Sequence, residues 1–306
     1  MTLEDNFKNH SSEYIFSNDN FLAKQRENVF NKINLKNYDK KNNDSLKNLS
    51  ISDLSIFDYY YKPSKEEPTV TLLDEDSYNI NIINGKCKNY EDEKIQIKNI
   101  SSIDFKKFRD LNYSNLNDIV IDFNTIFLNS GIFINVKKNN NLLLNLTHNT
   151  DSNYTVFQNS FFNFDKYCEV EINDEFNFSH NTINNINYNI QANEGSKIEH
   201  NIFQNFSTTN KLYLTSSTVC EKKSSLKQNT YNFADGFVRN FHYANLIGEL
   251  SKASLKGCFF LKDKNICSNK THIVHNAENC ESSQTYKGTL NDFSKANYFS
   301  NTLVSE

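Results

Sequence analysis

The sequence predicts a mainly β protein, a parallel β-helix core behind a small helical N-terminal region. Three observations lead to this fold class. After residue 70, short runs of alternating apolar and polar residues follow one another along the chain. Between residues 120 and 300, hardly any segment longer than ten residues has helical periodicity. Asparagine is abundant throughout, and it tolerates the left-handed backbone that tight solenoid turns require.

The N-terminal part lacks strand alternation. Apolar residues between Phe21 and Leu35 recur at roughly helical spacing, which predicts an amphipathic helix around 18–34. The stretch KPSKEEP holds both prolines of the chain and is the best candidate for a linker. We therefore expect a helical region over 1–62, a linker over 63–69 and the β core over 70–306.

The predicted strands of the core fit two architectures. They are VTLL, YNINII, IVIDF, GIFINV, NLLLNL, YTVF, CEVEIN, INYNIQ, KIEHNIF, KLYLTS, YNF and ASLKGCFFL. An antiparallel sandwich or barrel requires tight hairpin turns, but only Asn84-Gly85 and Asp235-Gly236 have the usual sequence. A parallel β-helix stacks short strands and lets asparagines form hydrogen-bonded ladders, so we favour it although no exact repeat period is visible. Residues 138–149 have the pattern of one coil.

Composition narrows the possible partners and compartments. The net charge of −4 gives no global reason to expect nucleic acid or an anionic membrane as a partner. No stretch approaches the length of a membrane-spanning helix, and the N-terminus lacks the pattern of a secretory signal. The six cysteines have no zinc or iron–sulfur spacing, so we expect free and mostly buried thiols in a reducing compartment.

One stretch near the end of the chain concentrates reactive residue types. Residues 272–288 read HIVHNAENCESSQTYKG. In a strand, His272 and His275 point to opposite faces, so they cannot chelate one ion together. Cys280 and His275 could meet across a turn, but nothing nearby in the sequence orients the imidazole as a catalytic base. A structural or assembly role is favoured over a metal site or a nucleophile with its base.

The order of residues in this stretch resembles the SufB/SufD family, the scaffold proteins of Suf iron–sulfur cluster assembly. The matching positions are His275, Ala277, Cys280, Ser282, Gln284, Tyr286, Lys287, Gly288 and Leu290. The Tyr-Lys-Gly step and the cysteine favour the SufD branch. Weaker similarities lie at 25–28, 82–90, 128–136 and 238–261. Taken alone, Tyr286-Lys287-Gly288 would be an ordinary turn with Gly288 at positive φ and Lys287 in solvent.

The resemblance implies a right-handed parallel β-helix flanked by helical regions, which continues in the family beyond residue 306. It implies a non-catalytic scaffold subunit that pairs with a SufB-like scaffold and a SufC-like ATPase and supports cluster assembly and iron acquisition. It implies no cofactor held tightly by this chain alone, but a transient Fe–S cluster or iron at a shared interface, with Cys258, Cys267 and Cys280 as candidate ligands. The expected location is the cytoplasm or a plastid-type organelle.

Two other function classes fit a β-helix. A carbohydrate-active lyase or glycosidase would present acids on one sheet face, as Glu169 and Glu171 could, but a solvated face explains this pair more simply. This class is mostly secreted and often uses arginine, and the chain has only Arg26, Arg109 and Arg239. The other class is a structural solenoid without chemistry.

Overall fold

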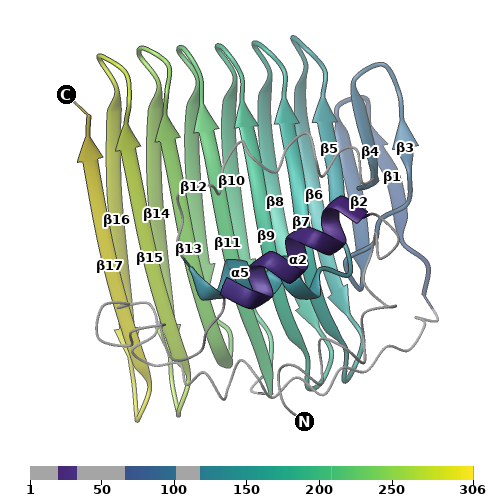
Figure 1. Ribbon diagram of the computed structural model, residues 1–306, viewed down its shortest axis with the longest axis vertical. Coiled ribbons are helices and arrows are strands. Elements are labelled where there is room, and N and C mark those ends of the chain that lie inside the picture. Colours follow the sequence, from purple (N-terminus) through teal and green to yellow (C-terminus); the bar gives the residue numbers. More distant parts are fainter. Residues whose placement is uncertain (1–19, 33–65, 101–117, 208, 306) are drawn as a thin grey trace.

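The computed structural model describes residues 20–32, 66–100, 118–207 and 209–305, which form a parallel β-solenoid with two helices (Figure 1). The strands form two sheets, one of eight strands and one of nine, and the chain passes alternately from one sheet to the other. From β5 and β6 onward, every pairing between neighbouring strands is parallel. At the start of the chain, β1 pairs antiparallel with β2, β3 with β4, and β4 with β5. The predicted fold class is confirmed, and the alternative of an antiparallel barrel is wrong.

The strands are as follows. Sheet A contains β1 (Thr69–Asp74), β2 (Ser77–Ile83), β6 (Asn141–Thr150), β8 (Glu169–Phe178), β10 (Lys197–Gln204), β12 (Ser225–Asn232), β14 (Lys252–Leu261) and β16 (Glu281–Leu290). Sheet B contains β3 (Tyr90–Glu91), β4 (Ile95–Asn99), β5 (Ile132–Val136), β7 (Thr155–Phe164), β9 (Ile183–Ala192), β11 (Asn210–Cys220), β13 (Gly236–Leu246), β15 (Ile266–His275) and β17 (Lys295–Val304).

The coils repeat at a spacing that the sequence does not show by inspection. Stacked positions in the middle coils are 28 residues apart, as in the Asn145–Asn173 pair, and later ones are 29 apart, as in Lys252–Glu281. The turns carry residues at positive φ, and several are asparagines such as Asn139, Asn153 and Asn181, as expected. Other turns place Tyr167 or Lys223 in the same conformation. Uneven coil length and varied turn residues together hide the period.

An asparagine ladder crosses the outer face of sheet A. Each side-chain amide donates to the side-chain oxygen of the asparagine one strand earlier, at 2.9–3.2 Å. The members, in strand order, are Asn79, Asn145, Asn173, Asn201 and Asn229. The ladder joins five coils along the solenoid axis, so it stabilises their register as well as each coil. The predicted asparagine ladder therefore exists, mainly within strands. At the turns, the Asn181 amide also donates to the side-chain oxygen of Asn153 at 2.7 Å, and both residues have positive φ.

The interior between the two sheets forms one core. Its members alternate along the strands with outward residues, and most are below a few per cent exposed. In the first coils they are aliphatic and aromatic, as with Leu144, Leu146, Phe162 and Phe164. Burial of this apolar surface is the main favourable term for stacking the coils.

Two helices cover part of the outer face of sheet B (Figure 1). The segment IVIDF, which we expected to be a strand, instead begins helix α5 (Ile119–Phe127). The Asp118 carboxylate caps the helix by accepting from the Val120 amide at 2.9 Å. Phe123 and Phe127 on its inner face pack against sheet B. The β-branched start suggested a strand, but the cap and the helical spacing of the apolar residues prevail.

The second helix, α2 (Asn20–Lys32), lies within the segment where the sequence predicts an amphipathic helix. Its Arg26 guanidinium donates to the carbonyl of Leu128, just after α5, at 3.2 Å. The Arg239 guanidinium on β13 forms a buried ion pair with Asp118, so α5 is fixed to the sheet at its N-terminus. Most of the predicted regions 1–62 and 63–69 falls outside the described residues, and the first strand begins at Thr69.

Two further features of the chain follow from these elements. Asn84 and Gly85 both have positive φ and join Ile83 to Lys86 as an antiparallel bridge, so this predicted tight turn is confirmed. Asp235-Gly236 instead lies in the connection from β12 to the parallel strand system of β13, so it is not a hairpin. In the part of the chain that the structure describes, neither helix has the length and apolarity needed to cross a membrane.

Candidate functional site

The residues singled out in 272–288 all lie in the last two coils. His275 ends β15, Cys280 closes the following turn, and Ser282, Gln284, Tyr286, Lys287 and Gly288 lie on β16. Strand β16 pairs in parallel with β14, and β15 pairs with β17. The segment is therefore a strand, a turn and the next strand, with side chains directed alternately inward and outward.

The two histidines of the segment lie on opposite faces of β15, as expected. His272 faces outward, where its ring stacks on Tyr243 at a centroid distance of 5.4 Å. Burial, aided by the charge of Lys270, lowers the pKa of His272. The His275 Nε2 lies 2.8 Å from the hydroxyl of Ser282, inside the turn. His275 and His272 cannot share one ion in this geometry.

His275 and Ser282 have the contact of a base and a hydroxyl nucleophile, but a third group is needed to orient the imidazole. Among the described residues, no carboxylate forms an ion pair or hydrogen bond with His275. The Cys280 thiol is engaged elsewhere, 3.4 Å from the hydroxyl of Ser251 and 3.5 Å from the carbonyl of Gly248. The arrangement fits a structural role for His275 and Cys280 better than a nucleophile with its base.

All six cysteines are free thiols, as predicted, and four are buried. Burial raises the pKa of Cys87 and of Cys220 to about 12. Burial also raises the pKa of Cys267 to about 11, although the side-chain amides of Asn232 and Asn269 donate to its sulfur at 3.0 and 3.2 Å. Since the thiolate is the form that binds iron, the interior cysteines are poor ligands. Of the three candidates Cys258, Cys267 and Cys280, only Cys258 and Cys280 are partly exposed.

The inward residues of β16 pack against β17. The Gln284 amide donates to the Thr302 hydroxyl at 2.8 Å. The Tyr286 ring stacks on Tyr298 at 4.4 Å, and the Tyr298 hydroxyl lies 3.2 Å from that of Thr271 on β15. Burial raises the pKa of Tyr286 beyond the range of ordinary phenols. These contacts tie the two sheets together across the last coil.

The Tyr-x-Gly step has a packing origin. Gly257 on β14 faces Tyr286 on β16, and Phe259 on β14 faces Gly288 on β16. A Cβ at Gly257 would lie 2.2 Å from the Tyr286 ring, and a Cβ at Gly288 would lie 1.9 Å from the Phe259 ring. Each glycine therefore makes room for the aromatic ring of the neighbouring strand.

The reading of Tyr286-Lys287-Gly288 as a turn is wrong. The three residues lie within β16, and Gly288 is not among the residues at positive φ. Lys287 does point outward and is exposed, as that reading assumed. Glycine is required here by the neighbouring ring and not by backbone conformation.

A buried ionic cluster that the sequence pattern does not indicate lies in the middle of the solenoid. The carboxylate of Asp174 on β8 is fully buried and lies 3.2 Å from His148 Nε2 on β6 and 3.2 Å from His200 Nε2 on β10. The hydroxyl of Tyr188, on the facing sheet, lies 2.9 Å from His148 Nε2. Burial alone would raise the pKa of Asp174, but the two histidines outweigh it and lower that pKa. Neighbouring members of the cluster are 26 residues apart, two fewer than the coil spacing, so they meet diagonally across adjacent strands and only the strand register places them together.

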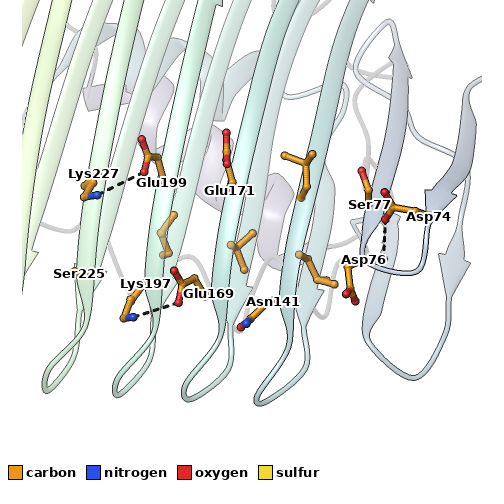
Figure 2. A pocket seen from close by; sticks show the side chains of 14 residues that line it. Asp74, Asp76, Ser77, Asn141, Glu169, Glu171, Lys197, Glu199, Ser225 and Lys227 are labelled. Carbon is orange, nitrogen blue, oxygen red and sulfur yellow. Dashed lines mark hydrogen bonds and ion pairs between the residues drawn. The ribbon is translucent and has the colours of Figure 1, made fainter.

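The described residues contain no group of three or more His, Cys, Asp or Glu side chains arranged to hold a metal ion. Glu169 and Glu171, the pair considered for a carbohydrate-active enzyme, line a shallow pocket on the outer face of sheet A (Figure 2). Glu169 pairs with Lys197 at 3.2 Å, and Glu171 accepts from the Asn201 amide at 3.3 Å. This arrangement supports a solvated, ion-paired face.

The comparisons with known proteins agree with the segment at the end of the chain. Residues 146–306 match the family model described as SUF system FeS cluster assembly, SufBD core domain. No curated protein matches the chain. The match starts within β6 and covers every coil from there to the last, including all the residues of the 272–288 segment. The chain is therefore a member of the SufB/SufD family, with a SufBD core domain that serves iron–sulfur cluster assembly by the Suf system.

Proposed function

We propose that this chain is a SufD-type, non-catalytic scaffold subunit that pairs with a SufB-like scaffold and, with it, engages a SufC-like ATPase. The Tyr286-Lys287-Gly288 step and Cys280 support the SufD branch over the SufB branch. The contacts of His275, Ser282 and Cys280 with neighbouring coils support an assembly role over turnover. A cytoplasmic or plastid-type location accompanies this proposal.

The family match over residues 146–306 carries the pairing, and among the described residues the interior of the last coil offers an uncovered surface for it. Leu290 continues the interior row of Leu261 but is 50% exposed, against 1% for Leu261. Val304 continues the row of Leu246 but is 67% exposed, against 0% for Leu246. The outer edges of β16 and β17 are also free to pair with a further strand, since each ends its sheet in the described structure. A strand of a second scaffold, or of a following part of the same chain, would cover this surface.

In this proposal the chain holds no cofactor tightly by itself. An Fe–S cluster or iron is cargo at the interface shared with the SufB-like partner, and the ATPase supplies the driving reaction. Thiolate and imidazole are the ligand types suited to iron. Cys280, partly exposed and next to the uncovered coil, is the cysteine of this chain best placed to contribute.

The test is co-expression with a SufB-type scaffold and a SufC-type ATPase from the same genome. We expect the three to co-purify. We expect Leu290→Glu with Val304→Glu to reduce recovery of the SufB-type protein about tenfold, because a buried hot spot would gain unpaired charges. The matched control is Leu72→Glu on β1, 52% exposed at the opposite end of sheet A, which should leave recovery unchanged.

Two results would contradict the proposal. One is recovery of the wild-type chain free of both proteins under the same conditions. The other is ATP hydrolysis or sugar-chain cleavage by the purified chain alone, which would identify it as an enzyme.

A further inference from the structure

The outer face of sheet A is divided by the asparagine ladder into two unlike halves. On the side where the strands begin, glutamates and lysines of neighbouring strands pair with one another (Figure 2). The nitrogen–oxygen distances are 3.2 Å for Lys197–Glu169, 3.6 Å for Lys227–Glu199 and 2.9 Å for Lys252–Glu281. This half satisfies its own charges and needs no partner.

On the other side of the ladder the face is aromatic. Phe203 on β10 and Tyr231 on β12 are in register, and their partly exposed rings stack at 5.0 Å with an interplanar angle of 10°. Phe233, just after β12, is 52% exposed, and Phe260 on β14 is 48% exposed. We name these four residues the aromatic patch. A monomeric protein rarely gathers large exposed apolar side chains in this way unless they bind something.

The charges around the aromatic patch are not paired among the described residues. The register row of Phe203 and Tyr231 continues through Cys258 on β14 to Lys287 on β16. Lys256 lies on β14, two residues before Cys258 and on the same face of the strand. Both lysines are exposed. The other lysines on the outward positions of sheet A are the three that pair with glutamates. Glu175, also exposed, begins the row on β8.

The row thus runs from the carboxylate of Glu175, over two stacked rings and Cys258, to the ammonium group of Lys287, and Lys256 lies beside it in the neighbouring row. We propose that the aromatic patch is a docking site for a segment of another protein that carries large apolar side chains flanked by carboxylates. The apolar side chains would cover Phe203, Tyr231, Phe233 and Phe260, and the carboxylates would pair with Lys256 and Lys287. Aromatic anchors with charge complementarity at the rim are the usual composition of a binding hot spot.

The dimensions of the row fit a short segment. From β8 to β16 the row crosses four strand spacings, about 19 Å. A helix of about thirteen residues spans this length, as does an extended segment of about six residues. The site does not depend on the SufD assignment, because its aromatic residues lie on the outer face at β10, β12 and β14, although Lys287 lies on β16 of the last coil.

The test is fluorescence anisotropy of three labelled peptides of about thirteen residues with the full chain. The first has Leu and Phe on one face and Glu beside them, the second has Lys in place of Glu, and the third has Ser in place of Leu and Phe. We expect the first peptide to bind at least about tenfold more tightly than either of the others.

Variants locate the site. Phe233→Ser and Phe260→Ser should each weaken binding of the first peptide about tenfold, and Lys256→Glu with Lys287→Glu should transfer preference to the Lys peptide. Leu72→Ser, also about half exposed but on β1, is the matched control and should change nothing. In a Cys280→Ser background, the first peptide should protect Cys258 from maleimide, since the remaining cysteines are buried.

Three results would overturn the proposal. Equal affinity for the Glu and Lys peptides would remove the role of the lysines. A dimer in sedimentation that Phe260→Ser abolishes would show that a second copy covers the patch. Protection of Cys258 without any peptide would show that part of the chain itself covers it.

Discussion

The interior of the first coils and the interior of the later coils are built from different chemistry. Around β6 and β7 most inward side chains are apolar and buried, among them Leu142, Leu144, Leu146, Phe162 and Phe164, and the polar ones are His148, Thr150, Gln158 and Ser160. On β12 and β13 a larger share of the inward side chains is polar, although Leu226, Val238, Ala244 and Leu246 also belong to the core. The polar ones include Gln228, Thr230, Asn232, Asn240 and His242, all equally buried.

The later coils compensate with hydrogen bonds across the interior. Gln204 and Asn240 exchange two bonds at 2.7 and 3.2 Å, and Thr230 lies 3.1 Å from His242 Nε2. Such bonds contribute about 1 kcal/mol each, less than a buried Leu or Phe. The same coil geometry is therefore stabilised more by apolar burial in the first coils and more by matched polar groups in the later ones. In the later coils, hydrogen bonds between specific pairs of side chains replace part of the stabilisation that apolar burial supplies in the first coils.

The largest expected effect tests the apolar half. Phe162 is 1% exposed, and its ring packs 5.0 Å from that of Tyr188. Phe162→Ala should lower the free energy of unfolding by about 3–5 kcal/mol, because it removes a buried ring and leaves a cavity. Urea denaturation followed by circular dichroism measures the change. Phe233→Ala, half exposed on the surface, is the control and should cost well under about 1 kcal/mol.

The second prediction concerns the boundary between the halves, where Asp174 lies between His148 and His200. Asp174→Asn should lower the free energy of unfolding by about 2–3 kcal/mol, because charged hydrogen bonds inside the core are lost. Replacing all three residues by Leu should recover most of this loss, since an apolar cluster of similar volume needs no charge compensation. A triple variant less stable than Asp174→Asn would show that the ionic cluster itself stabilises the fold.

The sequence predicted the fold class, the free thiols and the two faces of β15, because these follow from alternation and spacing. It did not predict the repeat, since coil lengths vary and the turn positions accept Tyr167 and Lys223 as readily as asparagine. Without the repeat, residues such as Asp174 and His200 cannot be placed in one cluster. The helix α5 was missed because Ile119, Val120 and Ile121 favour a strand locally, while the cap at Asp118 and packing on sheet B decide the structure.

The candidate site was predictable as a segment but not as an arrangement. The sequence shows that a glycine, Gly288, lies two residues after Tyr286, but it does not show why glycine is required there. That cause lies in Gly257 and Phe259, about thirty residues earlier and in register on the next strand. The contact of His275 with Ser282, in place of Cys280, depends in the same way on how the turn closes.

The third prediction uses pH to separate the halves. Burial, and then the charge of His200, lowers the pKa of His242 from 6.5 to about 3. The unfolded chain therefore binds more protons than the folded chain between these values, so stability falls as pH drops from about 6.5 toward 3. Near pH 5 the loss from His242 should be about 2 kcal/mol relative to pH 8.

His242→Gln keeps a partner for Thr230 and cannot titrate. It should remove that part of the pH dependence between pH 5 and pH 8 in urea titrations. An unchanged pH profile in this variant would contradict a neutral, buried His242.

The smallest expected effect tests whether the difference between the halves is confined to the interior. The asparagine ladder on the outer face crosses both halves with nearly constant geometry, from Asn79 to Asn229. Asn145→Ala and Asn201→Ala each remove two ladder bonds at partly buried positions, so each should lower the free energy of unfolding by about 1 kcal/mol. Urea denaturation of the two variants, measured side by side, checks this. A much larger loss of unfolding free energy for Asn201→Ala than for Asn145→Ala would mean that the ladder contributes more in the later coils. The outer ladder would then compensate for the weaker apolar burial in the interior of those coils, and the difference between the halves would not be confined to the interior.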